Sequence, residues 1–588
     1  MSTPSTKAAA LRPEDYLNID GRLSDEEIAI RDVVRSFVRD RVEPNVAEWF
    51  EEGRSPVDLM KELGAIGVLG MHLEGYGCAG TSATAYGLAC MELEAGDSGI
   101  RSLVSVQGSL AMFAIHRWGS EEQRERWLPP MAAGEAIGCF GLTEPDAGSD
   151  PGAMRTRARR DGTDWILNGQ KMWITNGGAA DLFTVFAKVG GEKFTAFLVE
   201  RNFPGVSSGA EEHKMGITGS STTAVYLDNV PVPVENVLGE IGRGHVIAFN
   251  ILNIGRLKLG PATVGAAKNV LAISLKYAKQ RKAFGSAIAE FGAIQHKLAE
   301  MAIRIFVAES MTWRVVGLIE NQMHGAAVES TNAPANASRD NSTQELKAIE
   351  EFAAECSMVK VYAAEMLDYV VDEGVQIHGG YGYHQDYAVE RAYRDSRINR
   401  LFEGTSEINR LVITGMPLKR AARGLLPLFE AARAVLQESD SPVAAGESKS
   451  EDPELSLVHK AKKIALLTLG VAHEKYSADL EKQQEIIMNL SDIIMEVFAM
   501  ESSLLRSRKL AAAGSGVNAA DACAVYLRDA IAKIELSSRT VLSACAQGDE
   551  LRRNLSRVRG YASHDPVNAI ALRRQIAGRL LANERYTV

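Results

Sequence analysis

Apolar residues recur at helical spacing near the start of the chain. From Ile28 onward they return every three or four residues, which is the period of one face of an α-helix. Ser24 stands just before this stretch and Glu27 follows three residues later, as in a capping box at a helix N-terminus. Ser120 and Gln123 repeat the arrangement. The pattern predicts an N-terminal helical domain.

The pattern changes at about Ile137 to short runs rich in β-branched and aromatic residues. These runs are Trp165–Leu167, Lys171–Thr175, Leu182–Ala187, Phe194–Glu200 and Thr223–Leu227. Gly, Asn and Pro separate them, which is typical of short strands joined by turns. We therefore expect a small antiparallel sandwich or barrel here.

The helical period returns at about Gly239 and continues through long stretches such as Asn253–Lys279. Two segments interrupt it. His324–Thr343 is rich in small polar residues and predicts a surface loop. Glu438–Pro453 is acidic and polar, as in a flexible linker. After the linker the helical period resumes and predicts a bundle of three to five helices.

These predictions add up to a mainly α protein with a central β domain. The predicted order is an N-terminal arm (1–22), a helical domain (23–136), a β-barrel or sandwich domain (137–238), a four-helix-bundle-like domain (239–437), the linker (438–454) and a C-terminal helical extension (455–588). An α, then β, then α order argues against βαβ units and hence against a Rossmann dinucleotide domain.

Composition narrows the functional classes. The 588 residues are 46% hydrophobic and carry a net charge of −10, which argues against a nucleic-acid binder. No apolar run approaches the length of a membrane span, and the start of the chain resembles neither a signal nor a transit peptide. Six scattered cysteines and eleven histidines lack metal-ligand spacing. We expect a cytoplasmic protein without a metal.

The first segment that suggests chemistry is Gly141–Asp150. Its small residues allow a backbone to approach a ligand closely. Thr143, Ser149 and the amide groups near Gly148 can hydrogen-bond a planar polar ring or a phosphate. The alternative is a turn-rich exit from a strand, and the residues alone favour neither interpretation.

The second segment, Asn168–Gly177, reads as a hairpin turn that leads into a strand. Trp173 and Thr175 then lie on the same face of that strand. The indole can flank a flavin ring while the threonine donates a hydrogen bond. Taken alone, a core tryptophan is the more common outcome.

The third segment, Gln376–Tyr383, contains glycines that permit a close backbone approach, although a helix C-terminus with glycine stops explains them equally. The fourth, Arg400–Asn409, places Glu403 at a break before a helix. A carboxylate in apolar surroundings can act as a general base near neutral pH. The alternative is a helix-start residue that stabilises backbone N–H groups, and by itself that alternative is favoured.

Taken together, the segments resemble a known family. Gly141–Ala153 and Gln376–Asp395 are similar to the two signature patterns of the acyl-CoA dehydrogenases, a family of flavoproteins. The second match includes Gly379, Gly380, Gly382, Asp386, Arg391 and Asp395. The resemblance extends from about Asp20 to about Met416 and includes the α, β, α order.

The resemblance implies FAD as cofactor. The residues implied to hold it are Phe140, Leu142, Thr143, Gly148, Ser149, Trp173, Thr175, Thr405 and Glu407, with Arg281, Phe284, Gln376 and Gly380 acting across a subunit interface. A cofactor shared in this way implies a homodimer.

The resemblance also implies that Glu403 is the catalytic base. It would remove the α-proton of an acyl-CoA while hydride passes from Cβ to the flavin, with the thioester carbonyl held by the Glu403 N–H and the FAD ribosyl hydroxyl. Some family members carry the base at the position that is Gly255 here, so no second carboxylate competes. Ser149, Asn253, Arg256 and Gly404 would contact the substrate.

Two features bear on the acyl group. The extension resembles that of the very-long-chain branch, which implies a dimer that acts on long fatty acyl-CoA in β-oxidation and passes electrons to electron-transfer flavoprotein. Asp97–Gly108 instead resembles the glutaryl-CoA branch, in which Arg101 would bind a substrate carboxylate. However, that branch has Tyr where Phe402 stands. Alternatively, Arg101 pairs with Glu92 or Glu94.

We expect the fatty acyl substrate, with a dicarboxylyl-CoA dehydrogenase or an oxidase-type relative as alternatives. A flavin-bound scaffold without activity is disfavoured because Glu403 is intact. The acidic linker disfavours strong membrane binding.

Overall fold

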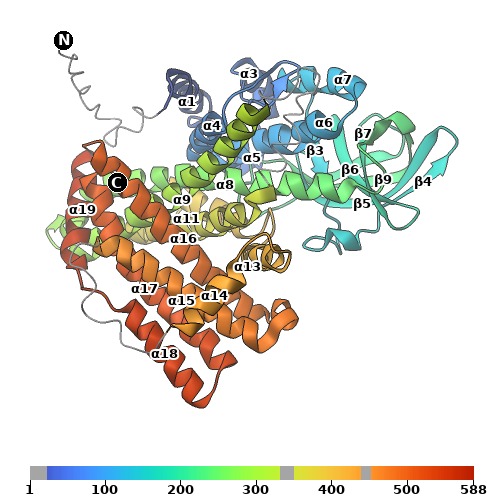
Figure 1. Ribbon diagram of the computed structural model, residues 1–588. Coiled ribbons are helices and arrows are strands. Elements are labelled where there is room, and N and C mark those ends of the chain that lie inside the picture. The colour runs from blue at the N-terminus through green and yellow to red at the C-terminus, as the bar shows by residue number, and fades with distance from the viewer. Residues whose placement is uncertain (1–22, 331–349, 439–451, 515) are drawn as a thin grey trace, which may run out of the picture.

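The computed structural model describes residues 23–330, 350–438, 452–514 and 516–588. The predicted N-terminal arm (1–22) and most of the linker (439–451) lie outside the described residues. The described chain forms a helical N-terminal part, a sheet at one end, and a large helical body (Figure 1). The predicted fold class, mainly α with a central β part, is therefore confirmed.

The N-terminal part is helical, as predicted, apart from one two-residue hairpin. Its helices are α1 (Asp25–Phe37), α2 (Val46–Glu52), α3 (Met60–Ala65), α4 (Ala83–Gly96), α5 (Ser98–Ser105), α6 (Phe113–Trp118) and α7 (Glu121–Ala132), with a π-helical turn η5 (Val106–Met112) between α5 and α6 and a hairpin of β1 (Glu74–Gly75) and β2 (Cys78–Ala79). Both predicted capping boxes are present, at Ser24 with Glu27 and at Ser120 with Gln123.

The central strands form one open, mixed sheet. They are β3 (Gly138–Gly141), β4 (Arg157–Asp161), β5 (Asp164–Thr175), β6 (Leu182–Val189), β7 (Lys193–Glu200), β8 (Val206–Glu211), β9 (Thr222–Pro233) and β10 (Val237–Leu238). Their order is β10-β7-β6-β4-β5-β9-β8, with β3 beside β6. Because β3 and β4 both run parallel to β6, the expected antiparallel sandwich or closed barrel is wrong for the described strands.

Two predicted strands merge in the structure. Trp165–Leu167 and Lys171–Thr175 both belong to β5, and the ladder to β9 is irregular between Leu167 and Gly169. The expected hairpin turn at Asn168 is therefore wrong. The turn lies instead at Gly162, between β4 and β5, where φ is 58° and glycine is favoured.

The helical body contains a core of long helices. They are α8 (Gly244–Gln280), α9 (Gly292–Ser330), α11 (Ala353–His378), α12 (Ala388–Ser396), α13 (Ser406–Ala422) and α14 (Leu428–Gln437), with a hairpin of β11 (Lys282–Ala283) and β12 (Ser286–Ala287) after α8. The predicted loop His324–Thr343 is wrong up to Ser330, because α9 continues through it; the remainder lies outside the described residues.

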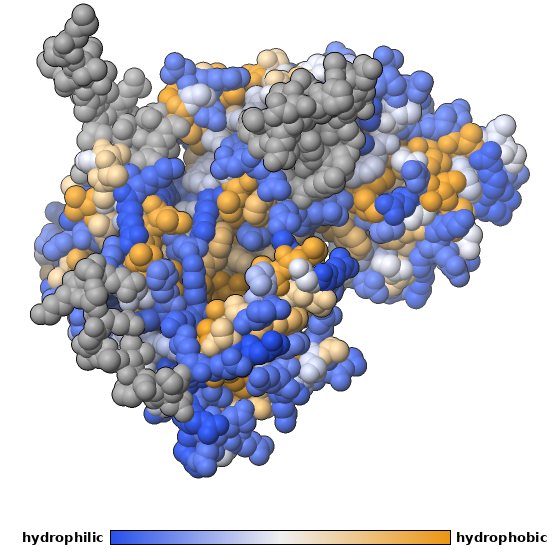
Figure 2. Space-filling model, viewed as in Figure 1, coloured by the Kyte–Doolittle hydropathy of each residue, from blue (hydrophilic) through white to orange (hydrophobic). Residues whose placement is uncertain are grey.

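The C-terminal extension is helical, as predicted. It consists of α15 (Pro453–Tyr476), α16 (Gln484–Ala512), α17 (Val517–Cys545), α18 (Gly548–Ala562) and α19 (Ala569–Asn583). It does not have a core of its own: Ile413 of α13, Leu467 of α15 and Ile493 of α16 belong to one buried hydrophobic cluster. The extension therefore packs directly on the helix that follows Glu403. On the face in Figure 2, hydrophilic residues dominate, and hydrophobic ones gather in a hollow near the middle.

Candidate active site

Glu403 lies in a tight turn between η10 (Arg397–Arg400) and α13. Its φ is 56° and that of Gly404 is 81°. A non-glycine residue with positive φ is strained, by about 1–3 kcal/mol, and such strain clusters at functional sites. The N-cap of α13 is Thr405, whose Oγ1 accepts a hydrogen bond from the Ile408 N–H at 3.2 Å. The interpretation of Glu403 as the helix-start residue is therefore wrong.

Hydrogen bonds from three elements hold this turn. The carbonyl oxygen of Glu403 accepts from Arg256 Nε at 3.2 Å and from Asn409 Nδ2 at 3.3 Å. The carbonyl of Gly404 accepts from Lys360 Nζ at 2.7 Å and again from Asn409, at 2.8 Å. In this structure Arg256 thus supports the backbone of the base, and its role toward CoA stays a prediction. Its other hydrogen bond, of 2.9 Å, goes from Nη1 to the side-chain oxygen of Asn253, which is also a predicted substrate residue.

The Glu403 carboxylate lies against α8. A Cβ at Gly255 would come within 2.6 Å of Oε1 and closer still to Oε2, so any side chain there would require the carboxylate to move. The Nζ of Lys258, one turn further along α8, lies 3.6 Å from Oε1. The expected apolar surroundings of the base are therefore wrong, because a cation and a glycine face its carboxylate.

Arg101 is buried near the base and has its own partner. Its side chain is 3% exposed and forms an ion pair with the fully buried side chain of Glu94, while Glu92 pairs instead with Arg35 at 2.7 Å. Burial would lower the pKa of Arg101, but Glu94 outweighs that effect and the pKa is raised. The guanidinium lies 5.9 Å from the centre of the Phe402 ring, and its Nη2 is buried with no hydrogen-bond partner among the described residues.

The first two motifs meet beside the sheet. Lys171 Nζ of β5 donates to the Leu142 carbonyl at 3.2 Å and to Glu144 Oε1 at 2.7 Å, and the Met172 N–H donates to the Thr143 carbonyl at 2.9 Å. Glu144 also accepts from two backbone N–H groups of the same loop. A buried ion pair therefore fixes the loop that contains Thr143, Gly148 and Ser149.

The surroundings of these motifs fit a flat aromatic cofactor. Trp173 is 59% exposed, so the core interpretation is wrong and its ring is open to a ligand. No atom lies within 4 Å of a Cβ built at Gly148, and Ser149 is exposed. Phe140 and Thr175 are half-buried nearby in the same sheet, and Leu142 is buried. The open indole and the hydroxyls of Thr143, Ser149 and Thr175 are suited to the isoalloxazine ring of FAD.

The other predicted FAD residues lie elsewhere. Arg281 and Gly380 line a surface cavity of about 520 Å³, in which the Arg281 guanidinium lies 5.5 Å from the centre of the Tyr381 ring. Phe284, at the tip of the β11–β12 hairpin, is 97% exposed, and Gln376 is exposed. Arg281 follows Arg256 by 25 positions, mostly within α8, which is about 37 Å of helix. Arg281 therefore lies far from Glu403 in the same chain, because Arg256 bonds the Glu403 carbonyl.

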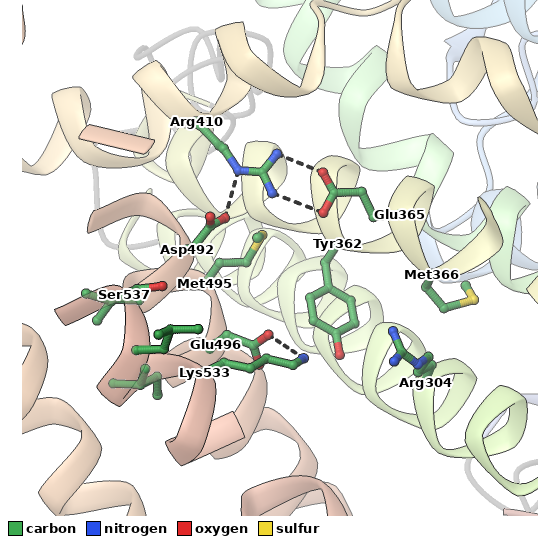
Figure 3. A pocket seen from close by; sticks show the side chains of 13 residues that line it. Arg304, Tyr362, Glu365, Met366, Arg410, Asp492, Met495, Glu496, Lys533 and Ser537 are labelled. Carbon is green, nitrogen blue, oxygen red and sulfur yellow. Dashed lines mark hydrogen bonds and ion pairs between the residues drawn. The ribbon is translucent and has the colours of Figure 1, made fainter. Parts of the chain in front are cut away.

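The helix behind the base is anchored to the extension (Figure 3). A cavity of about 340 Å³ lies between α9, α11 and α13 on one side and α16 and α17 on the other. At its edge Arg410 of α13 bonds both oxygens of Glu365, at 2.7 and 3.0 Å, and Asp492 of α16 at 2.7 Å. Glu407, exposed in the first turn of α13, has a lowered pKa because of hydrogen bonds to its own N–H and to Thr405.

Sequence reasoning missed four charged residues of this region: Glu144, Lys171, Lys258 and Lys360. All four are buried or nearly so. The sequence did offer one indication that Lys258 is buried, since it lies in an apolar stretch of a predicted helix, three residues after Gly255.

In the described parts of the chain, no cluster of three or more His, Cys, Asp or Glu could hold a metal ion, and no helix there is long and apolar enough to cross a membrane.

Comparisons with known proteins identify the family. Acyl-CoA dehydrogenase models match the chain as an N-terminal domain over 24–135, a middle domain over 139–230, a C-terminal domain over 242–415 and another C-terminal domain over 460–560.

Similarity to known proteins covers most of this chain. A probable acyl-CoA dehydrogenase of Bacillus subtilis is 43% identical and covers 98% of this chain and 96% of its own. The crystal structure of an acyl-CoA dehydrogenase complexed with FAD from Bacillus anthracis is similar with a TM-score of 0.90 at 41% identity, covering 97% of both chains. A glutaryl-CoA dehydrogenase from Mycobacterium smegmatis in complex with FADH2 gives a TM-score of 0.60 at 40% identity, over 70% of this chain and 98% of that one.

Proposed function

The chain belongs to the acyl-CoA dehydrogenase family, whose members are FAD-dependent oxidoreductases, and from that premise we propose that it dehydrogenates fatty acyl-CoA to trans-2-enoyl-CoA. The observation that carries the proposal is the position of Glu403. Its strained turn is held by three elements, and its carboxylate lies against Gly255, where a side chain would displace it.

Different residues of this chain have different roles in the proposed reaction. Glu403 accepts the α-proton of the thioester at a carboxylate oxygen, and its backbone N–H donates to the thioester carbonyl, which acidifies the α-carbon. Arg256, Asn409 and Lys360 hold that backbone in place. Bound FAD supplies the hydride acceptor, and Thr143, Ser149, Trp173 and Thr175 are placed to hold it.

A cavity near the base supports a fatty acyl substrate. It has a volume of about 110 Å³, and Lys258 and Asn253 lie on its wall. The apolar part of the wall consists of Gly87, Ile254, Leu257, Pro261, Val316 and Ile319. Arg101 and Lys258 each face a carboxylate, Glu94 and Glu403, so neither offers an unpaired charge to a substrate anion. A long acyl chain is our proposal because the C-terminal extension resembles that of the very-long-chain branch of the family.

A second candidate is a dicarboxylyl-CoA. Two observations favour it: the buried Nη2 of Arg101 has no hydrogen-bond partner in the described structure, and the Mycobacterium smegmatis relative is a glutaryl-CoA dehydrogenase. An incoming carboxylate could satisfy that nitrogen. It would also have to compete with Glu94 for the guanidinium.

The deciding experiment is anaerobic bleaching of the bound flavin by acyl-CoA thioesters from short to very long chains, with glutaryl-CoA in the same series. We expect complete bleaching with fatty acyl-CoA, fastest among the long chains, and little with glutaryl-CoA. Rapid bleaching by glutaryl-CoA alone would replace our substrate class with the second candidate. No bleaching by any thioester would refute the proposed reaction.

The electron acceptor and assembly follow as further parts of the proposal. We propose electron-transfer flavoprotein as the electron acceptor in β-oxidation. The ratio of electron-transfer flavoprotein reduced to hydrogen peroxide formed distinguishes a dehydrogenase from an oxidase.

We also propose a homodimer, because Arg281, Phe284, Gln376 and Gly380 lie far from Glu403 in one chain. The cytoplasmic location and the absence of strong membrane binding stay predictions from the sequence.

A further inference from the structure

Lys258 is a buried cation that the family resemblance does not assign to any role. It lies on α8, three positions after Gly255, so both residues face the same way. Gly255 leaves room for the Glu403 carboxylate, and Lys258 places its Nζ 3.6 Å from Oε1. Both side chains are nearly inaccessible, at 3% and 12% exposed. One helix turn thus supplies both the space and the counter-charge for the base.

A second contact fixes the direction of the ammonium group. Lys258 Nζ donates to Ser109 Oγ at 2.8 Å. Ser109 lies in the π-helical turn η5, and its own hydroxyl donates to the Ser105 carbonyl at 2.6 Å. The Ser109 hydroxyl proton is therefore engaged with the Ser105 carbonyl, and the Ser109 oxygen accepts the hydrogen bond from Lys258. Such π-helical turns are frequent at functional sites. The ammonium is held between this oxygen and the carboxylate.

The other charged groups around the pair have separate partners. Arg101 of α5 pairs with Glu94 of α4, Arg256 bonds the Glu403 carbonyl, and Lys360 of α11 bonds the Gly404 carbonyl. The remaining titratable groups that face the pair are His72, Tyr86, Cys90 and Cys356. Burial lowers the pKa of His72 to about 3 and raises those of Cys90 and Cys356 to about 11 and 12, so these stay neutral near pH 7. Burial likewise raises the pKa of Tyr86.

Lys258 is therefore the one ammonium group, among the described residues, with an ion pair to the base carboxylate. Burial lowers the pKa of Lys258, and the charge of Glu403 opposes that shift. The two groups attract each other in a site that excludes most water, so the ammonium group restrains the position of the carboxylate.

We propose that Lys258 is a positioning residue that holds the Glu403 carboxylate against α8 in the orientation that proton abstraction needs. The proposal rests on the proposed role of Glu403 as base. Its consequence is a rate of flavin reduction that depends on a cation at this position.

The test is the rate of anaerobic flavin reduction in the holoenzyme of Lys258→Met. We expect the rate at saturating acyl-CoA to fall by about tenfold or more, since a misplaced catalytic group loses rate steeply. Lys258→Arg should recover at least half of that loss. We expect the change in kcat to exceed the change in KM. Lys276→Met, at an exposed position of the same helix, is the matched control and should leave the rate unchanged.

A double-mutant cycle with Glu403→Gln gives a readout that does not depend on turnover. In denaturant unfolding of the holoenzyme, the effects of Lys258→Met and Glu403→Gln should not add, because each single change leaves the other group without its partner. An unchanged rate of flavin reduction in Lys258→Met, or additive unfolding effects, would overturn the inference. If Glu403→Gln itself reduced flavin at a normal rate, the proposed base would fail instead, so the two failures are distinguishable.

Discussion

The Glu403 carboxylate and the α-carbon of Gly255 are packed so closely that a side chain at 255 would displace the carboxylate. A Cβ there would lie 2.6 Å from Oε1, well inside van der Waals contact. The two residues are 148 positions apart in sequence, and the glycine leaves the space that the carboxylate occupies.

Gly255→Ala should displace the base without unfolding the protein. Since a misplacement of about 1 Å can cost a factor of about 100 in rate, we expect flavin reduction by acyl-CoA to slow by roughly that factor. Gly415→Ala on α13, where a Cβ meets no atom within 4 Å, is the matched control. Stopped-flow absorbance of the two variants decides, and equal rates would show that Glu403 tolerates the crowding.

The position of Glu403 at a break before a helix could be predicted from the sequence because that evidence is local, whereas its role as base came from the family resemblance. For Lys258 the sequence offered only its place in an apolar stretch, because its partner is remote and a lysine in a helix usually faces solvent. The parallel pairing of β3 was also hidden, since a strand of four residues with two glycines, Gly138 and Gly141, gives almost no strand signal.

The open position of Trp173 was hidden for a related reason. A tryptophan in a strand is usually buried, and only the irregular ladder between Lys171 and Ile174 and the φ of 55° at Trp173 turn it outward. Helix periods and capping boxes, by contrast, were read correctly, because they depend on neighbours three or four residues away.

The ion pair between Glu144 and Lys171 should control FAD retention. Glu144→Gln keeps the shape of the side chain but leaves the Lys171 ammonium without its counter-ion at a buried site. We expect the loop to loosen and the flavin content after gel filtration to fall well below one per chain. Asp146→Asn changes an exposed carboxylate of the same loop and should retain FAD. Full occupancy in Glu144→Gln would contradict this view of the loop.

Glu309 should make stability depend on acid pH. It is buried on α9 between Arg506 of α16 and Lys268 of α8. Burial alone would raise the pKa of Glu309, but the two cations outweigh it and bring the pKa to about 2. A folded-state pKa below the unfolded value stabilises the protein above the unfolded pKa, and this stability is lost as pH falls through the folded one.

We therefore expect stability to decline between about pH 4.5 and pH 2 by a term of about 3 kcal/mol. Glu309→Gln should lower the free energy of unfolding at pH 7 by about 3 kcal/mol, because two partly buried cations lose their buried partner, and should abolish that term. Glu584→Gln removes an exposed ion pair with Lys279 and should cost less than about 1 kcal/mol. Denaturant unfolding from pH 7 to pH 3 makes the comparison, and equal losses in both variants would be the contrary result.

Arg410 should link the C-terminal extension to α13, the helix that follows Glu403, and so help to hold Glu403 in place. Arg410→Met removes the links to Glu365 and Asp492 while leaving every residue that faces Glu403 unchanged. We expect kcat to fall several-fold with FAD content unchanged, because α13 begins shortly after Glu403 and would be less firmly held. Arg433→Met on the exposed face of α14 is the control. If both variants retained full kcat, the extension would contribute only stability.

The central claim is that Glu403 removes the α-proton, and the most direct test is the rate of anaerobic flavin reduction by a saturating fatty acyl-CoA in Glu403→Gln. The amide keeps the shape of the side chain and cannot accept the proton. A positioned general base contributes a factor of about 10² to 10⁴, so we predict a loss of that size with FAD content unchanged. Reduction at a rate close to that of the unmodified enzyme would contradict the account.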